Sequence, residues 1–342
     1  MTGQDDFRSD TVTRPDAAMR AAMASAEVGD AVYEDCPTTR RLEAMAAERL
    51  GKEAALFFPT GTQSNLAALM AYCGRGDEYL VGHTAHTFLY EGGGAAVLGS
   101  IQPQPLPNEA DGTIALAAIE AAIKPDDFHH ARTRLLTLEN TFGGLVLDPD
   151  YLDAATGLAR RHGLATHLDG ARLMNAAVAT GCAPDALVEG FDTVSLCLSK
   201  GLGAPVGSVL AGPADVIASA RRLRKMLGGG MRQTGILAAA AIHALDHNVA
   251  RLADDHALAA RLADVLAAFP ELGSGPARTN MVFMTPVGTD VDGFRQFLAD
   301  RGIVVGGRYG SLRWVTHLDV DDAAVDRVQA ACEAYFLHAR RS

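Results

Sequence analysis

The middle of the chain alternates short, β-rich apolar runs with longer Ala- and Leu-rich runs of helical character. The apolar runs cover 134–138, 164–168, 193–198 and 206–211, and a helical pattern at 149–162 separates the first two. Strands and helices that alternate in this way are typical of a mostly parallel sheet with helices on its faces. The pattern therefore predicts an α/β fold with a mostly parallel central sheet covered by helices.

The pattern changes near residue 248. A long amphipathic helix is expected first, and shorter strands and helices follow it. The predicted elements are a helix at 249–269, a strand at 281–285, a helix at 291–301, strands at 303–306 and 312–316, and a helix at 321–339. We therefore expect a large domain over 1–248, including the N-terminal segment, and a small C-terminal α/β domain over 249–342.

Charge and cysteine usage limit the classes of partner. A net charge of -11 argues against nucleic acid, because phosphate binding needs a basic face. The five cysteines are scattered without a Cys-x-x-Cys pair, which fits neither a disulfide framework nor a structural zinc site and suits a reducing cytoplasm. The polar, acidic start is no signal peptide, and the apolar stretch 235–245 is too short for a bilayer, which takes about 20 residues. We expect a cytoplasmic protein with no membrane partner.

Three polar residues follow apolar runs of the predicted sheet at or just past the end of each run: Asn140, Asp169 and Lys200. In open α/β sheets, ligands bind in the crevice beyond the carboxyl ends of the strands. We therefore expect these three side chains to meet at one crevice.

Lys200 and Asp169 each have a chemical and a plain structural interpretation. A lysine that follows an apolar strand can be desolvated, which frees a nucleophilic amine, although a lysine that reaches solvent is the commoner case. A carboxylate at a strand end can keep a pyridinium nitrogen protonated, and it can equally cap a helix. His167 and Asp169 alone offer too few ligands for a metal, so we expect no metal site.

Two further motifs fit a phosphorylated cofactor. The run 59–65 places Gly61 and Thr62 before a helix predicted at 66–73, where free backbone N–H groups can bind a phosphate. An ordinary capped helix is an equal alternative. His86, in a loop after an apolar run, can stack on a cofactor ring or relay a proton, although a lone surface histidine is more common.

The three strongest signals occur in a meaningful order. A phosphate site at a helix start, a carboxylate for a ring nitrogen and a nucleophilic lysine follow one another as in pyridoxal-phosphate enzymes of the aspartate-aminotransferase fold. The interval between Asp169 and Lys200 leaves room for one helix and one strand. The set therefore predicts pyridoxal 5'-phosphate as the cofactor.

Nearly the whole chain closely resembles low-specificity L-threonine aldolases, and the motifs that carry the resemblance are specific. They are Arg8–Pro15 (RSDTVTRP), Gly29–Tyr33 (GDAVY), Phe58–Gln63 (FPTGTQ), His167–Arg172 (HLDGAR), Leu198–Gly207 (LSKGLGAPVG), Lys225–Gln233 (KMLGGGMRQ) and Val315–Leu318 (VTHL). The resemblance implies the fold of type I pyridoxal-phosphate enzymes. It also implies a homotetramer of close dimers with active sites at the subunit interface.

The resemblance assigns a role to individual residues. Lys200 is similar to the lysine that binds the cofactor covalently, Asp169 to the partner of the ring nitrogen, and His86 to the residue stacked on the ring. Gly61 and Thr62 are similar to phosphate ligands. Ser9, Arg172 and Arg313 are similar to a clamp on the substrate carboxylate, and Arg172 is also similar to a residue beside the cofactor. Tyr33, Lys225 and Arg232 are similar to residues that reach a site across the subunit interface. Taken alone, the basic cluster around 221–232 is typical of a solvated helix face; the resemblance makes it part of a phosphate site.

Phe142 departs from the family pattern. The family commonly has a histidine after Glu-Asn-Thr, near the substrate hydroxyl, whereas this chain has Phe142, which cannot hydrogen-bond or transfer a proton. Either that histidine is dispensable or the substrate preference differs. We expect Phe142 to line the substrate site, to weaken discrimination at the hydroxyl and to favour aryl substrates such as phenylserine.

The expected activity is cleavage of L-threonine, L-allo-threonine and related L-β-hydroxy-α-amino acids to glycine and an aldehyde. His86, or a water that it holds, is the candidate base for the hydroxyl proton. Another reaction of the same cofactor, transamination or β-elimination, is the main alternative among enzymes. A cofactor-binding protein without activity is the alternative from another class, and the presence of Lys200, Asp169 and both clamp arginines argues against it.

Overall fold

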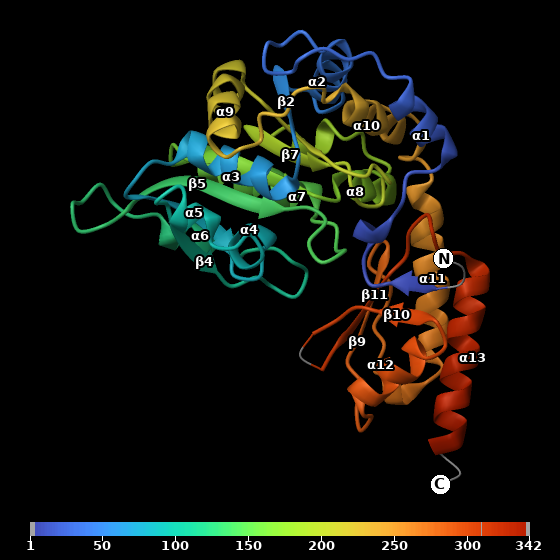
Figure 1. Cartoon of the computed structure of the whole chain (residues 1–342). Helices are drawn as coiled ribbons and strands as arrows, with labels where there is room; N and C mark the ends of the chain where they lie inside the picture. The colour runs from blue at the N-terminus through green and yellow to red at the C-terminus, as the bar shows by residue number, and fades with distance from the viewer. Residues whose placement is uncertain (1–3, 309, 340–342) are drawn as a thin grey trace.

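The computed structural model describes residues 4–308 and 310–339. It has a large part built on a seven-stranded sheet and a small part, beneath it in Figure 1, with two two-stranded sheets. The strands of the large sheet are β2 (Ala54–Phe58), β3 (Asp77–Gly82), β4 (Gln102–Leu106), β5 (Arg132–Glu139), β6 (Ala165–Gly170), β7 (Thr193–Cys197) and β8 (Ser208–Gly212).

The large sheet has the strand order β2-β8-β7-β6-β5-β3-β4. Strand β8 runs antiparallel to both of its neighbours, and the other pairings are parallel. The predicted mostly parallel sheet is therefore confirmed. The carboxyl ends of β5, β6 and β7 meet at one edge, since Glu139 pairs with Asp169 and Asp169 with Ser195.

Helices cover both faces of this sheet. Helices α3 and α9 pack on one face, and α2, α7, α8 and α10 belong to the core on the other. The period of two along β2 shows why: Leu56 and Phe58 join the α3–α9 cluster, whereas Phe57 joins the opposite core. The helices of the large part are α1 (Ala17–Ala24), α2 (Pro37–Arg49), α3 (Gly61–Tyr72), α4 (His86–Leu89), α5 (Gly94–Val97), α6 (Leu116–Ala122), α7 (Pro149–Arg161), α8 (Leu173–Thr180), α9 (Ala214–Met226) and α10 (Gly235–His247), with the short 3-10 turns η1 (Asp10–Val12) and η2 (Ala186–Val188).

The small part has its own apolar core around Trp314, Phe294 and Phe7. Its elements are α11 (Leu252–Ala267), η3 (Pro270–Leu272), β9 (Met281–Met284), α12 (Val291–Ala299), β10 (Ile303–Val305), β11 (Leu312–Val315) and α13 (Asp322–Ala339). Helices α11 and α13 pack side by side, as Figure 1 shows.

Strand β1 (Asp5–Phe7) pairs in parallel with β10, and Phe7 is fully buried in the small core. The sequence pattern had placed the whole N-terminal segment in the large domain over 1–248. The structure differs because a three-residue strand is too short to show a period, and its partner lies some 300 residues away. The N-terminal segment therefore begins in the small part and then enters the large one.

Most predicted elements differ from the observed ones by a few residues. Helix α3 is an exception because it begins at Gly61, five residues before the predicted start at 66. The Thr60 side chain caps it by accepting a hydrogen bond from the Gln63 backbone N–H at 3.1 Å. The first turn is polar, so the apolar period that marks the rest of the helix is absent there.

Candidate active site

A cavity of about 360 Å³ lies beyond the carboxyl ends of β6 and β7 and at the start of α3. Among its lining residues are five that the sequence predicted as cofactor ligands: Gly61, Thr62, His86, Asp169 and Lys200. They come from four separate chain segments, and the fold brings them to one place. Of the three strand-end residues expected at one crevice, Asp169 and Lys200 line this cavity, whereas Asn140 does not.

The N-terminus of α3 offers backbone donors to this cavity. Hydrogen bonds from the Gly61 and Thr62 N–H groups to other described residues are absent, as expected for the first turn of a helix. A Cβ added to Gly61 would meet no atom within 4 Å, so the backbone faces open space there. Two free N–H groups and the positive end of the helix dipole suit a phosphate.

Asp169 is 3% exposed and its carboxylate is hydrogen-bonded on both oxygens. The Ala171 N–H donates to Oδ1 at 3.0 Å, and Asn65 Nδ2 donates to Oδ2 at 3.0 Å. Behind Asn65 lies fully buried His167, which Asn65 Oδ1 meets at 3.1 Å and whose pKa burial lowers to about 4. A neutral histidine therefore fixes Asn65, and Asn65 fixes the carboxylate.

His86 stands at the start of α4, opposite Asp169. Its Nδ1 lies 3.0 Å from Glu91 Oε1, and this hydrogen bond raises the pKa of His86. The His86 backbone N–H donates to Glu139 Oε2 at 2.9 Å. Burial, followed by the nearby Asp169 carboxylate, raises the pKa of Glu139 to about 7. Two carboxyl groups thus hold His86, one through its ring and one through its backbone.

His86, Glu91 and Asp169 have ligand atoms within 4.8 Å of one another, a spacing that suits a metal ion as well. Asn65 Nδ2 already bonds both carboxylates of this group, at 2.9 and 3.0 Å. The expectation that the site uses no metal stays a prediction.

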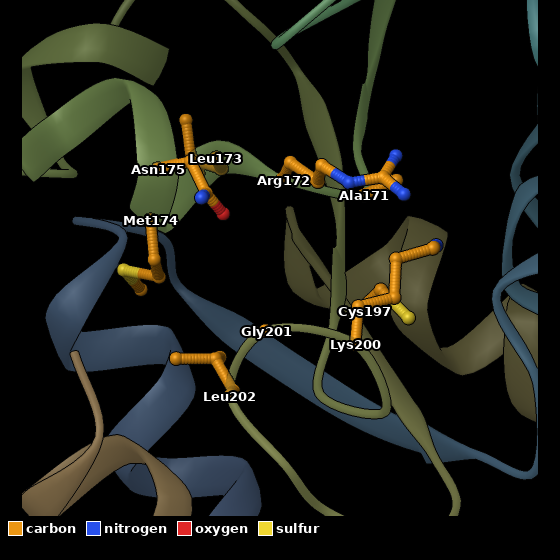
Figure 2. A pocket seen from close by; sticks show the side chains of 9 residues that line it. All are labelled: Ala171, Arg172, Leu173, Met174, Asn175, Cys197, Lys200, Gly201 and Leu202. Atoms are coloured by element: carbon orange, nitrogen blue, oxygen red, sulfur yellow. The ribbon is translucent and has the colours of Figure 1, made fainter. Parts of the chain in front are cut away.

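Lys200 lies in the turn after β7, and its side chain extends to the same side as that of Arg172 (Figure 2). Lys200 Nζ donates no hydrogen bond to another described residue. A void of about 10 Å³, the size of one water molecule, lies between the 171–175 and 200–202 segments. The Lys200 carbonyl accepts a hydrogen bond from Thr13 Oγ1 at 2.8 Å, which anchors the turn to the N-terminal segment.

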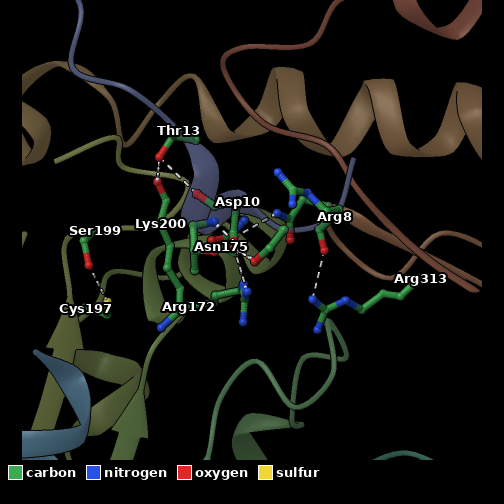
Figure 3. Close-up of polar contacts among 12 residues, drawn as sticks. Arg8, Asp10, Thr13, Arg172, Asn175, Cys197, Ser199, Lys200 and Arg313 are labelled. Atoms are coloured by element: carbon green, nitrogen blue, oxygen red, sulfur yellow. Dashed lines mark hydrogen bonds and ion pairs between the residues drawn. The ribbon is translucent and has the colours of Figure 1, made fainter. Parts of the chain in front are cut away.

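None of the three members of the predicted carboxylate clamp lines the large cavity. Arg172 and Arg313 lie on the same side of Lys200 in Figure 3. Arg172 makes two hydrogen bonds to Asp10, at 2.8 and 2.6 Å. Arg313 Nη2 donates to the Arg8 carbonyl at 3.0 Å, and its buried Nε has no partner among the described residues. Ser9 caps η1 by accepting from the Thr11 N–H at 3.3 Å.

Besides the clamp, four more predicted residues lie outside the cavity wall. Tyr33 is 76% exposed, Lys225 is exposed, and Arg232 pairs with Asp30 at 3.0 Å. Their predicted contacts to a partner's site stay predictions. Phe142 follows β5 and lies against Gly112, so close that a Cβ there would be 2.8 Å from the Phe142 ring. Its expected place in the substrate wall likewise stays a prediction.

Sequence reasoning did not assign roles to Asn65, Glu91 or Asp10. Asn65 could have been found, because it lies four residues after Gly61 and so shares that face of α3. Glu91 has no such signal, since it lies in a short turn between α4 and α5. Asp10 lies inside a motif that was noted for its likeness alone.

Sequence comparisons place the chain among known enzymes. The family model for beta-eliminating lyases matches residues 6–287. The low specificity L-threonine aldolase of Escherichia coli strain K12 is 51% identical over 96% of this chain and 98% of its own. A probable low-specificity L-threonine aldolase of Arabidopsis thaliana is 45% identical over 97% of both chains.

Solved structures share the fold at lower identity. A threonine aldolase of Leishmania major superposes with a TM-score of 0.81 at 21% identity, over 96% of this chain and 99% of that one. A putative L-allo-threonine aldolase of Listeria monocytogenes gives a TM-score of 0.78 at 18% identity, over 95% and 96%. Within the described residues, no helix is long and apolar enough to span a bilayer. The chain belongs to the beta-eliminating lyase family, and within it to the low-specificity L-threonine aldolases.

Proposed function

We propose that this enzyme cleaves L-threonine, L-allo-threonine and related L-β-hydroxy-α-amino acids to glycine and an aldehyde. The observation that carries the proposal is the meeting of Lys200, Asp169 and the α3 N-terminus around one cavity of about 360 Å³, beside two arginines suited to a carboxylate. The test is to incubate the purified protein with L-threonine and measure acetaldehyde and glycine. Equal amounts of both products are expected, and their absence at saturating cofactor and substrate would overturn the proposal.

We infer that the cofactor is pyridoxal 5'-phosphate. The donors suit it chemically: free N–H groups of Gly61 and Thr62 for the phosphate, a hydrogen-bonded Asp169 carboxylate for the ring nitrogen, and the Lys200 amine for the aldehyde carbon. When bound, this cofactor accepts the electron pair that a bond at the substrate Cα releases. His86 lines the same wall, which supports the proposal that its ring would stack on the cofactor ring.

The chain's own residues determine which bond is broken. Only a bond that stands perpendicular to the cofactor ring can pass its electrons to it, so the substrate has to be held in one orientation. A planar guanidinium binds a carboxylate through two parallel hydrogen bonds and fixes its plane. Arg172 and Arg313 would thus hold the substrate carboxylate so that Cα–Cβ is the bond that breaks.

Cleavage also needs a base for the hydroxyl proton of the substrate. His86 and Glu139 are two of the titratable groups at this edge, and Glu139 Oε2 accepts a hydrogen bond from the His86 backbone N–H. We propose that His86, directly or through a water, takes the proton as the aldehyde leaves. The Cα of the glycine fragment would regain a proton before glycine is released, and Lys200 would be the residue that holds the cofactor between turnovers.

We further propose that the active form is a homotetramer in the cytoplasm. Tyr33, Lys225 and Arg232 are exposed polar groups, which supports a role for them at a subunit interface. Lys225 and Arg232 would then add positive charge to the phosphate site of a neighbouring subunit.

The alternative reactions of the same cofactor are transamination and β-elimination. The description of the matching family names β-elimination, which gives that reaction a specific reason for testing. L-Serine and L-cysteine derivatives with a leaving group on Cβ would give pyruvate if elimination occurs. We expect glycine and aldehyde to dominate, and a larger rate of pyruvate or keto-acid formation would favour the alternatives.

A further inference from the structure

The carboxylate of Asp10 is 0% exposed and bonds Arg172, one of the two arginines of the proposed clamp. We propose that Asp10 is a positioning residue that selects the bond broken at the substrate Cα, because it fixes the plane of the Arg172 guanidinium. This inference rests on the proposed function and deepens it. It assigns to the N-terminal segment a task that neither the cavity nor the family likeness identifies.

The geometry of the pair determines an orientation as well as a contact. Arg172 Nε donates to Asp10 Oδ2 at 2.8 Å, and Nη2 donates to Oδ1 at 2.6 Å. Two parallel hydrogen bonds between planar groups leave the guanidinium little freedom to rotate. Nη1 has no hydrogen-bond partner among the described residues, so this nitrogen remains available for a substrate carboxylate.

Besides Arg172, two residues from different parts of the chain bond Asp10. Asn280, which precedes β9 in the small part, donates to Asp10 Oδ2 at 3.3 Å and to the Thr316 carbonyl at 3.1 Å. Thr13 Oγ1 lies 3.0 Å from the Asp10 carbonyl and 2.8 Å from the Lys200 carbonyl. One short turn therefore links the direction of Arg172 to the lysine turn and to the small part.

Charge explains why Asp10 acts by orientation rather than by attraction. Burial would raise the pKa of Asp10, but the charge and hydrogen bonds of Arg172 outweigh it and lower the pKa to about 2. Asp10 is therefore ionised in any ordinary assay, and it cancels most of the charge of Arg172. The net positive charge that attracts a carboxylate is left to Arg313, which has no carboxylate partner among the described residues.

Removal of the Asp10 charge should therefore leave carboxylate binding intact while the orientation is lost. Glu139 also acts electrostatically on Arg172, so without the Asp10 charge it would draw the guanidinium away from its present position. A substrate gripped in a variable plane presents different bonds to the cofactor ring. We therefore expect the Asp10 variant to lose selectivity for one bond at the substrate Cα while its affinity for the substrate changes little.

Glycine in deuterium oxide measures this selectivity without any cleavage. Exchange breaks one Cα–H bond, releases the proton to solvent and returns a deuteron to Cα, with no net oxidation or reduction. A glycine held in one plane presents only one of its two hydrogens, so the parent holoenzyme should stop at one deuteron. With Asp10→Asn, the ratio of second to first exchange rate should rise roughly tenfold or more, since small errors of position cost this much.

The matched control is Asp77→Asn, which also removes a buried carboxylate paired with an arginine. Asp77 is 5% exposed, lies 2.9 Å from Arg132 Nε, and stands at the start of β3, the end of the strand far from the cavity. The Asp77→Asn variant should, like the parent, exchange only one of the two glycine hydrogens for deuterium. If Asp10→Asn yields too little folded protein, Asp10→Glu replaces it, because its longer carboxylate cannot meet Nε and Nη2 from the same place.

Each outcome decides the matter. The proposal is overturned if the parent takes up two deuterons, if the Asp10 variant stops at one, or if the Asp77 variant loses selectivity equally. Glycine dissociation constants, measured from the change in cofactor absorbance, should differ by less than about threefold between parent and Asp10→Asn. A parent that exchanges glycine but does not cleave L-threonine would contradict the proposed function and leave the Asp10 result valid.

Discussion

Glu139→Gln should stabilise the protein at neutral and alkaline pH and leave it unchanged at acidic pH. The Glu139 carboxyl lies at the end of β5, where burial and the Asp169 carboxylate raise its pKa to about 7. In the parent, Glu139 Oε2 accepts a hydrogen bond from the His86 N–H at 2.9 Å. Glutamine has the same shape, and its side-chain oxygen can accept the same bond. The substitution therefore removes the ionisable proton and little else.

The sign follows from the proton count of the two states. The ordinary pKa of the group is 4.5 and the folded value is about 7, so the folded protein keeps a proton that the unfolded chain has lost. Stability is therefore highest below about pH 4.5 and falls as the pH rises toward 7. At about 1.36 kcal/mol per pKa unit, the difference between the folded and unfolded pKa corresponds to roughly 3 kcal/mol of stability. Because solvent reaches part of the Glu139 side chain, we expect roughly 2–3 kcal/mol.

Thermal unfolding at pH 5 and at pH 8 tests this magnitude. A chain of 342 residues has an unfolding entropy near 0.7 kcal/mol/K, so the variant should unfold about 3–4 °C above the parent at pH 8. At pH 5, half a pKa unit above the ordinary value, about a quarter of this difference should remain. Glu78→Gln is a control of opposite sign. It removes the buried carboxylate that pairs with Lys124, so it should destabilise the folded protein. Equal effects of Glu139→Gln at both pH values would refute the reasoning.

Four further outcomes follow from the site. Lys200→Ala should abolish the yellow absorbance of a covalently bound cofactor, and borohydride trapping followed by peptide mapping should place the label on Lys200. Arg313→Ala should lower kcat/KM roughly tenfold to hundredfold, since a charged hydrogen bond is worth ~1.5–3 kcal/mol; an unchanged value would exclude the clamp role. Light scattering should give a tetramer, and only a 35.9 kDa monomer in the active fraction would contradict it. Phe142→His should change the threo/erythro ratio and lower kcat/KM for phenylserine, whereas unchanged values would leave the ring with its packing on Gly112 alone.

The sheet and the floor of the site could be predicted because both depend on local patterns. Apolar runs define the strands, and the polar residue that ends a run lies at the sheet edge where ligands bind. Asp169 and Lys200 were found in this way, and both line the cavity. Gly61 and Thr62 were found because a helix start leaves N–H groups free, which is also a local property.

The residues that orient these groups could not be predicted, because they act through long-range contacts. Asn65 meets His167 and Asp169 across some 100 positions, and Asp10 meets Arg172 across 162. Neither contact leaves a period or a spacing in the sequence. The pairing of β1 with β10 was missed for the same reason, since three residues are too few to show an alternation.

The path of the N-terminal segment explains how two separate cores can share one substrate. Strand β1 is fixed in the small core by Phe7, and three residues later Asp10 is buried against Arg172 of the large part. The same segment receives Arg313, whose Nη2 bonds the Arg8 carbonyl, from β11 of the small part. The two clamp arginines thus belong to different parts, yet both are hydrogen-bonded to the same short stretch, residues 8–10. A displacement of the small part that kept these bonds would carry Asp10 with it and turn Arg172, so the grip on the substrate depends on how the two parts are joined.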